Sequence, residues 1–353
     1  MILTDLQEIF KIPDPVCPDS LVLEQASGRE AADYVASLIP ENSVVADITA
    51  GLGINTCFFN RRARQVFSVE IDSQRSMALG HNLRNSNVEV INEDCQEWLD
   101  SFEGHLDIVY ADPARRNKLN RKLVLIEDCS PNILELMPVL KEKADRLLIK
   151  TSPLLDMKEV SRLIPEVEGF HVIEVNREVK ELLIDVNLKQ VSQIVPYVKC
   201  VIIDKENSRR IIDVQPANGG QSENFTGKIE LRAEVLYSGG YIYEPSPALM
   251  KAGNFDVLYL YCPAIQKFAQ NTHLFFSKEF YQNFPGRIFQ IRSRMTAGDL
   301  KKIKGARFNV ISRNHPARAP ELETRYKLKS SDTDFLIACS TLDEKIILNV
   351  VKI

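Results

Sequence analysis

Carboxylate residues stand at the ends of four apolar segments in the first third of the chain. Asp47 ends the segment that begins at Val44, Glu70 follows the next segment, and Asp94 and Asp112 follow the third and fourth. Carboxylate oxygens accept hydrogen bonds from hydroxyl and amino groups and pair with cations. If the segments are parallel strands, their carboxyl ends share the edge at which open α/β sheets bind ligands. The four acids therefore predict one ligand site that is rich in acceptor oxygens.

A glycine turn separates Asp47 from the helix that follows it, in the sequence A-G-L-G-I-N-T. Dinucleotide sites need a third small residue in the pattern G-x-G-x-x-G, but counting from Gly51 that position is Thr56. Asp47 would also lie close to a pyrophosphate and repel it. S-adenosylmethionine instead offers an ammonium group and a ribose, which carboxylates bind well. The residues thus favour S-adenosylmethionine, and a dinucleotide-dependent oxidoreductase is the weaker alternative.

Each residue around the turn has an expected role toward this cofactor. Asp47 is expected to hold the methionine end, and Glu70 to accept both ribose hydroxyls. Because glycine has no Cβ, the backbone of Gly51–Gly53 can approach the cofactor closely. Ile71 is expected to lie against the adenine and Asp94 to accept its amino group, although Asp94 alone is also a plausible helix N-cap. The predicted cofactor-binding residues are Asp47, Thr49, Gly51, Gly53, Asn55, Thr56, Glu70, Ile71, Asp94, Cys95 and Asp112.

Short apolar segments alternate with helical segments up to about residue 205, and these elements must position the acids. The expected strands are residues 44–48, 65–69, 88–91, 107–110, 146–149, 171–175 and 198–203. Short Val- and Ile-rich strands between helices are typical of parallel sheets that are covered on both faces. The sequence therefore predicts an α/β fold with a doubly wound, mostly parallel, seven-stranded Rossmann-like sheet.

The chain changes character after about residue 205, where turn-rich stretches separate the apolar segments. A length of 353 residues favours two or three domains. We expect an N-terminal arm and helix over residues 1–40 and the sheet domain over residues 41–205. A β-rich connecting region is expected over residues 206–280, and a smaller α+β domain over residues 281–353.

The composition is that of an ordinary soluble protein, with 44% hydrophobic residues, 26% charged residues and a net charge of −4. No apolar run is long enough to span a bilayer, and the N-terminus lacks the basic region of a secretion signal. The seven cysteines are scattered, with no metal-ligand spacing. We therefore expect reduced thiols, no metal, no membrane contact and a cytoplasmic location.

Together the motifs D-I-T-A-G-L-G-I-N-T, V-F-S-V-E-I-D, N-E-D and Y-A-D-P-A-R-R resemble those of class I S-adenosylmethionine-dependent methyltransferases. More narrowly, the chain resembles a bacterial family of methyltransferases with a C-terminal THUMP-like domain, over most of residues 20–353. Relatives in that family carry a further N-terminal helical region, which this chain is expected to lack. The resemblance implies an RNA-related methyltransferase whose THUMP-like domain is formed by residues 281–353.

The tetrad Asp112-Pro113-Ala114-Arg115 bears on the reaction type. Enzymes that methylate exocyclic amines of bases often have Asp or Asn, two prolines and an aromatic residue here, and the ring stacks on the flipped base. This chain lacks the ring, although an arginine plane can also stack on a base. We expect Asp112 to orient the acceptor nitrogen, with Pro113 and Arg115 beside it as catalytic residues.

Methylation at C5 of a pyrimidine would require a cysteine nucleophile near the end of the fifth strand. That strand is expected to end in Lys150-Thr151-Ser152-Pro153, without a cysteine. Transfer to a nitrogen is therefore predicted rather than transfer to a carbon. Lys150 and Arg116 are expected to contact an anionic substrate; the alternatives are a surface position for Lys150 and pairing of Arg116 with nearby acids.

Twelve Lys and Arg residues lie between Arg287 and Lys329, against three Asp and Glu residues. A local excess of positive charge is typical of a surface that binds a polyanion, and the resemblance implies RNA as that partner. The alternative is that acids elsewhere in the fold balance this charge. The predicted substrate-binding residues are Arg116, Lys150, Arg292, Arg294, Lys302, Arg307 and Arg313.

Three functions remain open at this stage. The favoured one is a methyltransferase that acts on a base nitrogen in RNA and docks the RNA on its basic C-terminal domain. The second is a methyltransferase for a protein or a small molecule. The third is a non-catalytic module that binds RNA or S-adenosylmethionine, which the departure at Ala114 and Arg115 suggests.

Overall fold

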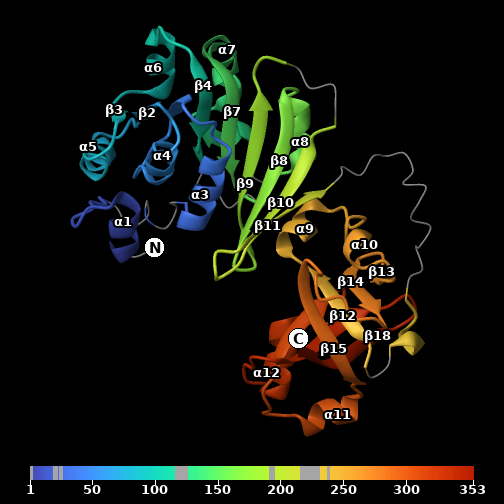
Figure 1. Ribbon diagram of the computed structural model, residues 1–353. Helices are drawn as coiled ribbons and strands as arrows, with labels where there is room; N and C mark the ends of the chain where they lie inside the picture. The colour runs from blue at the N-terminus through green and yellow to red at the C-terminus, as the bar shows by residue number, and fades with distance from the viewer. Residues whose placement is uncertain are drawn as a thin grey trace. The chain divides into compact units, whose positions relative to one another are not determined.

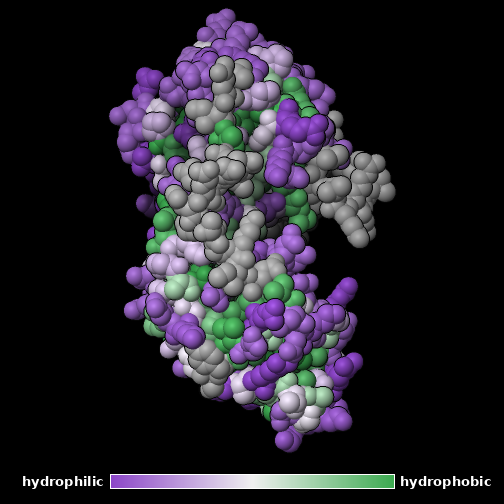
Figure 2. Space-filling model, turned by 90° about the vertical axis from the view of Figure 1, so that its right-hand side faces the viewer, coloured by the Kyte–Doolittle hydropathy of each residue, from purple (hydrophilic) through white to green (hydrophobic). Residues whose placement is uncertain are grey.

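The protein forms two compact units, Met1–Pro216 and Ala217–Ile353, each with its own sheet (Figure 1). The structure is a computed structural model. It describes residues 3–18, 23, 27–115, 126–190, 195–214, 231–236 and 239–353. Hydrophilic residues cover most of the face of each unit that is seen in Figure 2, with smaller hydrophobic areas between them.

The first unit is built on a nine-stranded sheet in the order β11-β10-β8-β9-β7-β4-β1-β2-β3. Its strands are β1 (Val44–Asp47), β2 (Gln65–Val69), β3 (Val88–Ile91), β4 (Leu106–Ala111), β7 (Ala144–Thr151), β8 (Val167–Val175), β9 (Glu178–Asn187), β10 (Tyr197–Ile203) and β11 (Arg209–Val214). Only the contacts of β9 with β7 and β8, and of β10 with β11, are antiparallel. The predicted α/β fold with a mostly parallel sheet is confirmed.

The predicted number of seven strands is wrong, because β9 and β11 were not expected. The hairpin between β8 and β9 turns at Asn176 and Arg177, whose φ angles are 51° and 69°. Two successive residues with positive φ match the twist of a tight hairpin, but the usual signal for such a turn is Asn-Gly or Asp-Gly. Since no glycine is present here, the sequence does not mark the turn.

Helices and one small ribbon complete the first unit. The helices are α1 (Leu3–Phe10), α3 (Arg29–Ser37), α4 (Ile54–Phe59), α5 (Ser73–Asn82), α6 (Cys95–Ser101), α7 (Ile133–Lys143), α8 (Met157–Leu163) and the short 3₁₀ helix Ile126–Asp128. The ribbon pairs β5 (Ala114–Arg115) with β6 (Cys129–Ser130).

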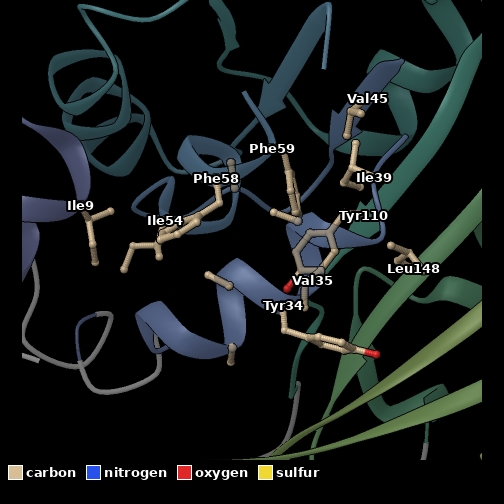
Figure 3. Close-up of a cluster of buried hydrophobic side chains, with 14 of the residues drawn as sticks. Ile9, Tyr34, Val35, Ile39, Val45, Ile54, Phe58, Phe59, Tyr110 and Leu148 are labelled. Atoms are coloured by element: carbon tan, nitrogen blue, oxygen red, sulfur yellow. The ribbon is translucent and has the colours of Figure 1, made fainter. Parts of the chain in front are cut away.

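Aromatic side chains fill the core between α3, α4 and the sheet (Figure 3). Phe58 and Phe59 of α4 are almost fully buried, and the ring of Phe59 meets the ring of Tyr110 edge-on with centroids 5.1 Å apart. Burial of one such side chain contributes about 1.5–3 kcal/mol. This packing fixes α4, and therefore the glycine turn that precedes it, against β1 and β4.

The second unit has a seven-stranded sheet in the order β13-β14-β12-β15-β18-β17-β16. Its strands are β12 (Tyr241–Pro245), β13 (Gln266–Ala269), β14 (Thr272–Ser277), β15 (Gly286–Arg294), β16 (Asn309–Arg313), β17 (Asp334–Ser340) and β18 (Lys345–Lys352). Its helices are α9 (Pro247–Ala252), α10 (Leu258–Tyr261), α11 (Ala297–Lys302), α12 (Ala319–Tyr326) and the short 3₁₀ helix Ala233–Val235. Because β12 pairs with β15, the predicted boundary between residues 280 and 281 falls inside one sheet.

Two further observations concern the described part of the chain. None of its helices has the length and apolar character that a membrane span requires. It also contains no cluster of three or more His, Cys, Asp or Glu side chains that could hold a metal ion.

A buried polar network lies between β7, β8 and β9. The guanidinium of Arg146 donates two hydrogen bonds to Asp185, at 2.6 and 2.5 Å, and the Asp185 side chain is only 2% exposed. His171 lies between the hydroxyls of Tyr34 and Tyr197, and Tyr197 also donates to Asp185. Burial by itself would raise the pKa of Asp185, but hydrogen bonds from His171, Arg146 and Tyr197 outweigh it and hold this pKa far below its ordinary value.

Replacing Asp185 with Asn is expected to lower the free energy of unfolding by about 3 kcal/mol, since it leaves a buried guanidinium without its counter-ion. A depressed carboxyl pKa stabilises the fold above the unfolded-state value of about 4 and loses that effect as pH falls. The difference between wild type and variant should therefore shrink in urea titrations below about pH 4. The control is Asp145→Asn, because the Asp145 side chain is 48% exposed. A loss no larger than that of the control would contradict this account.

Candidate functional site

The turn after β1 depends on two glycines with left-handed backbone conformation. Gly51 has a φ of 54° and Gly53 a φ of 82°, and Gly53 is the N-cap of α4. A Cβ on Gly53 would lie 2.4 Å from the Cδ1 atom of Leu79 on α5, so the Leu79 side chain would have to move. The sequence predicted that the glycines allow a ligand to approach the turn closely. The structure shows that Gly53 also allows α5 to pack closely against the turn.

A pocket of about 500 Å³ opens beside this turn at the carboxyl ends of β1, β2, β3 and β4. Nine of the predicted cofactor-binding residues line it: Asp47, Thr49, Gly51, Asn55, Glu70, Ile71, Asp94, Cys95 and Asp112. Gly53 and Thr56 are not among its lining residues. The structure therefore brings together residues that are 65 positions apart in the sequence, as the shared edge of parallel strands requires.

Asp47 is 1% exposed at the bottom of the turn. Its Oδ2 atom accepts a hydrogen bond from the Thr56 hydroxyl at 2.7 Å, and its Oδ1 atom accepts one from the Thr49 backbone N–H at 3.3 Å. Burial raises the pKa of Asp47 to about 7, although both hydrogen bonds lower it. A cation bound in the pocket would favour the charged form. Thr56 therefore orients Asp47 from behind the pocket.

Glu70 connects the two loops that border the pocket. Its Oε2 atom accepts from the Gly51 N–H and its Oε1 atom from the Asp72 N–H, both at 2.9 Å. Each carboxylate oxygen has a further lone pair that a hydroxyl could use. The neighbouring Ile71 is 67% exposed at the pocket, which suits contact with a flat apolar ring.

Asp94 serves as the N-cap of α6, where its Oδ1 atom accepts from the N–H groups of Gln96 and Glu97. This is the structural alternative that the sequence left open for Asp94. The residue still lines the pocket, next to Cys95. Burial raises the pKa of the Cys95 thiol to about 11.

Asn55 offers a test of whether the pocket fits a polar ligand. Its Nδ2 atom donates to the Ser27 hydroxyl at 3.1 Å and to the Tyr110 hydroxyl at 3.0 Å. Its Oδ1 atom is buried and has no partner among the described residues, while Asn55 lines the pocket. A ligand with a hydrogen-bond donor would satisfy that atom, as the ammonium of S-adenosylmethionine can.

Several pocket residues were missed by the sequence reasoning. Ser27 reaches the pocket from the segment before α3, and Asn132, Glu135 and Leu136 reach it from the beginning of α7. The only local signal is the Asn-x-x-Glu pattern at the start of α7, where the Asn132 side chain accepts from the Leu134 N–H. That pattern marks a helix start and carries no information about a ligand.

Asp112 lies at the end of β4 with its N–H bonded to the Thr49 hydroxyl at 2.6 Å. Its Oδ2 atom accepts from Lys150 Nζ at 2.6 Å, and the same Nζ lies 3.8 Å from Glu181 Oε1. Burial lowers the pKa of Lys150, but the Asp112 and Glu181 carboxylates raise it above its ordinary value. Lys150 is thus a charged partner of two acids inside the protein. Pro113 is buried beside Asp112, whereas the Arg115 side chain and the whole of Arg116 lie outside the described residues.

The predicted RNA-contacting cations of the second unit largely form ion pairs with acids. Arg292 pairs with Asp334, Arg294 with Glu344, Lys302 with Asp299 and Arg313 with Glu244. Arg307 donates to the backbone oxygen of Ser330. Acids of the same unit therefore balance the charge of four of these five residues, which was the alternative to an RNA-binding surface.

Two family models match parts of the chain. One described as ribosomal RNA adenine dimethylase matches residues 29–106, and one described as a ferredoxin-like domain matches residues 241–285. The crystal structure of a candidate methyltransferase from Porphyromonas gingivalis W83 is similar over nearly the whole chain. It has 27% sequence identity and a TM-score of 0.81, and the likeness covers 96% of this chain and 84% of that one. No match was found among curated proteins.

Two other solved structures are similar over about half of the chain. TrmK of M. capricolum, in complex with S-adenosylhomocysteine, has 17% identity and a TM-score of 0.36, over 48% of this chain and 72% of that one. The tRNA m1G37 methyltransferase of M. jannaschii has 13% identity and a TM-score of 0.33, over 47% of this chain and 51% of that one. At these TM-scores the likeness carries no functional information.

The family match over residues 29–106 includes the glycine turn and the carboxylates Asp47, Glu70 and Asp94. Together with the likeness over nearly the whole chain and the carboxylate-rich pocket, it identifies S-adenosylmethionine as the cofactor.

Replacing Asp47 with Asn is expected to weaken S-adenosylmethionine binding by about tenfold or more, because a charge-assisted bond contributes about 1.5–3 kcal/mol. In wild type the affinity should rise with pH through about 7, where the buried carboxyl ionises. The variant should lose that pH dependence. Calorimetry between about pH 6 and pH 8 measures both effects.

The matched control is Asp72→Asn, since Asp72 caps α5 and does not line the pocket. Its affinity should stay within about twofold of wild type. An Asp47 variant that binds like the control would remove Asp47 from the cofactor site.

Proposed function

We propose that the chain is an S-adenosylmethionine-dependent methyltransferase that methylates a nitrogen of a base in RNA. The observation that carries this proposal is the Asp112 carboxylate. Lys150 pairs with this carboxylate, and the Asp112 backbone N–H donates to the Thr49 hydroxyl. The residue lines the cofactor pocket, and its side chain is still 34% exposed. A carboxylate held in this way can accept a hydrogen bond from an N–H of the acceptor and orient it. The cofactor supplies an electrophilic methyl group on a sulfonium.

The described cysteines argue against transfer to carbon. Such a reaction needs a thiolate that attacks the base first. Here β7 ends in Lys150 and Thr151, and Cys95 lies on the β3 side of the pocket with its pKa raised to about 11 by burial. A thiol with that pKa is almost entirely protonated at neutral pH and is a poor nucleophile. A base nitrogen has a lone pair that can attack the methyl group directly, so no thiolate is required to activate it.

RNA as the acceptor is supported by the family described as ribosomal RNA adenine dimethylase, whose model matches residues 29–106 of the first unit. A reaction on RNA is also in keeping with a cytoplasmic location, which we propose for this protein. Both the acceptor, a base nitrogen, and the substrate, an RNA, are part of this proposal.

We assign RNA docking to the second unit, whose seven-stranded sheet with its helices would be the THUMP-like domain. A cavity of about 590 Å³ there is lined by Arg287, Arg313 and Arg318. Lys301 and Lys304, on and after α11, form no ion pair within the described part of the chain. Arg287 and Arg313 pair with Glu244, so Arg318, Lys301 and Lys304 are the best candidates for phosphate contacts.

The first experiment compares RNA modifications by mass spectrometry in strains with and without the protein. A methylated base that disappears in the deletion strain, and returns with wild type but not with Asp47→Asn, is the expected result. Identical modification profiles in the two strains would contradict an RNA substrate. Methyl transfer to a non-RNA acceptor that persists after RNase treatment would support a protein or small-molecule substrate instead.

The second experiment tests the docking surface with the triple variant Lys301→Gln, Lys304→Gln and Arg307→Gln. If each cation contacts a phosphate, the slope of log affinity against log salt should fall by about 2 for single-stranded RNA. Filter binding over a range of salt concentrations measures it.

The control for the docking surface replaces Arg292 and Arg294 with Gln, since both already pair with acids. Its salt slope should change by less than about 1. Equal slopes for wild type and the triple variant would exclude this surface from RNA docking.

A further inference from the structure

A second cavity, of about 600 Å³, lies in the first unit beyond the ends of β7 and β8 and the beginning of β9. Lys150, Val175, Asn176 and Glu181 line it from the sheet, and helices α1 and α3 close its other side. Its volume is in the range of cavities that hold small organic ligands. It therefore occupies the same ligand-binding edge of the sheet as the cofactor pocket, further along the strand order.

The two cavities are neighbours. Ser27 and Asp112 line the cofactor pocket, while Gly28 and Lys150 line the second cavity. Ser27 and Gly28 are consecutive, and Asp112 and Lys150 form an ion pair at 2.6 Å. The Asp112–Lys150 pair is therefore part of the wall between them, and a molecule in the second cavity would meet the cofactor side at Asp112.

Glu181 lines this cavity and does not line the cofactor pocket, so the cofactor site gives no reason for its burial. It is 4% exposed, yet its Oε2 atom has no hydrogen-bond partner among the described residues. Its Oε1 atom lies 3.8 Å from Lys150 Nζ, the group that also binds Asp112. A buried carboxylate oxygen without a donor is costly, so its retention in a cavity points to a ligand that donates a hydrogen bond.

We propose that the second cavity receives the acceptor base and that Glu181 accepts a proton from the amino group that becomes methylated. This inference rests on the proposed function and deepens it. An exocyclic amino group has two N–H bonds, and the two carboxylates on either side of Lys150 can take one each: Asp112 orients the group and Glu181 receives its proton.

The step balances in atoms and electrons. The acceptor nitrogen uses its lone pair to form a bond to the methyl carbon, while the carbon–sulfur bond breaks and its electron pair stays on sulfur. The positive charge that reaches nitrogen is removed when its proton passes to Glu181 Oε2, and from there to solvent. The products are a methylated base, a neutral thioether and one proton.

The charged groups around Glu181 set its basicity. Burial raises the pKa of Glu181 above its ordinary value; Lys150 and a Ser27 hydrogen bond lower it, and Asp112 raises it. The other charged residues of the cavity are Asp5 and Glu8 of α1, Arg29 and Glu30 of α3, and Lys180 of β9. A carboxylate with a raised pKa is a better proton acceptor at neutral pH than an exposed one.

The test compares Glu181→Gln, Glu181→Asp and a control, Glu178→Gln, which changes an exposed acid on the same strand. Methyl transfer is measured from labelled S-adenosylmethionine at saturating concentration to total RNA from a strain that lacks the protein. Glu181→Gln should lower kcat by about 100-fold, within the usual range for a general base, and should leave the KM for the cofactor unchanged. Glu181→Asp should recover part of the rate.

The pH profile separates a proton acceptor from a structural residue. The wild-type rate should fall on the acidic side as Glu181 takes up a proton, and Glu181→Gln should lack this fall. Calorimetry with S-adenosylhomocysteine shows that each variant is folded. A Glu181→Gln variant that keeps the rate and the pH profile of the Glu178→Gln control overturns the proposal.

A second measurement separates failure of this inference from failure of the RNA function. With S-adenosylhomocysteine bound, saturation-transfer NMR records binding of adenosine and cytidine monophosphates as probes. Binding by wild type that is lost in Glu181→Gln supports the cavity assignment, even if total RNA is not a substrate. No binding by wild type, or equal binding by the variant, overturns it, even if RNA is methylated.

Discussion

One buried ammonium holds the centre of the first unit together. Lys150, at the end of β7, contacts Asp112 beyond β4 and Glu181 on β9, so a single charge joins three strands that meet at the ligand-binding edge. Burial raises the pKa of Glu181, and the Lys150 ammonium opposes that rise. This contact holds the Asp112 carboxylate in place and forms part of the wall between the two cavities.

Three carboxylates at this edge have the same chemistry and different surroundings. Asp47 is buried and bonded to Thr56 and the Thr49 N–H, which suits it to a cationic group of the cofactor. Asp112 is partly exposed and fixed by Lys150, which suits it to a ligand that comes and goes. Glu181 is buried, and one of its two carboxylate oxygens has no hydrogen-bond partner among the described residues. Environment, and not residue type, is what separates the binding, orienting and proton-accepting roles proposed for these three acids.

Sequence reasoning succeeded where the determinants are local. The strands that end at Asp47 and Glu70 follow from short apolar runs, and their meeting follows from the geometry of parallel strands. It failed where the determinants lie far apart in sequence. The turn at Asn176 and Arg177 uses positive φ angles without glycine, and Arg292 finds its acid 42 residues later at Asp334. No local pattern encodes such contacts. The sequence therefore did not predict β9, and it did not show that acids elsewhere in the chain balance the positive charge of residues 287–329.

The hydrogen bonds of Glu70 have a consequence for how the cofactor site works. Since its two oxygens already hold the N–H groups of Gly51 and Asp72, the loops around the pocket are locked in place before any ligand arrives. Arrival of a ligand then costs little conformational entropy. The same acid holds both loops and is the proposed acceptor for the ribose hydroxyls of the cofactor. Replacing Glu70 would therefore make both loops more mobile as well as remove a contact to the ligand.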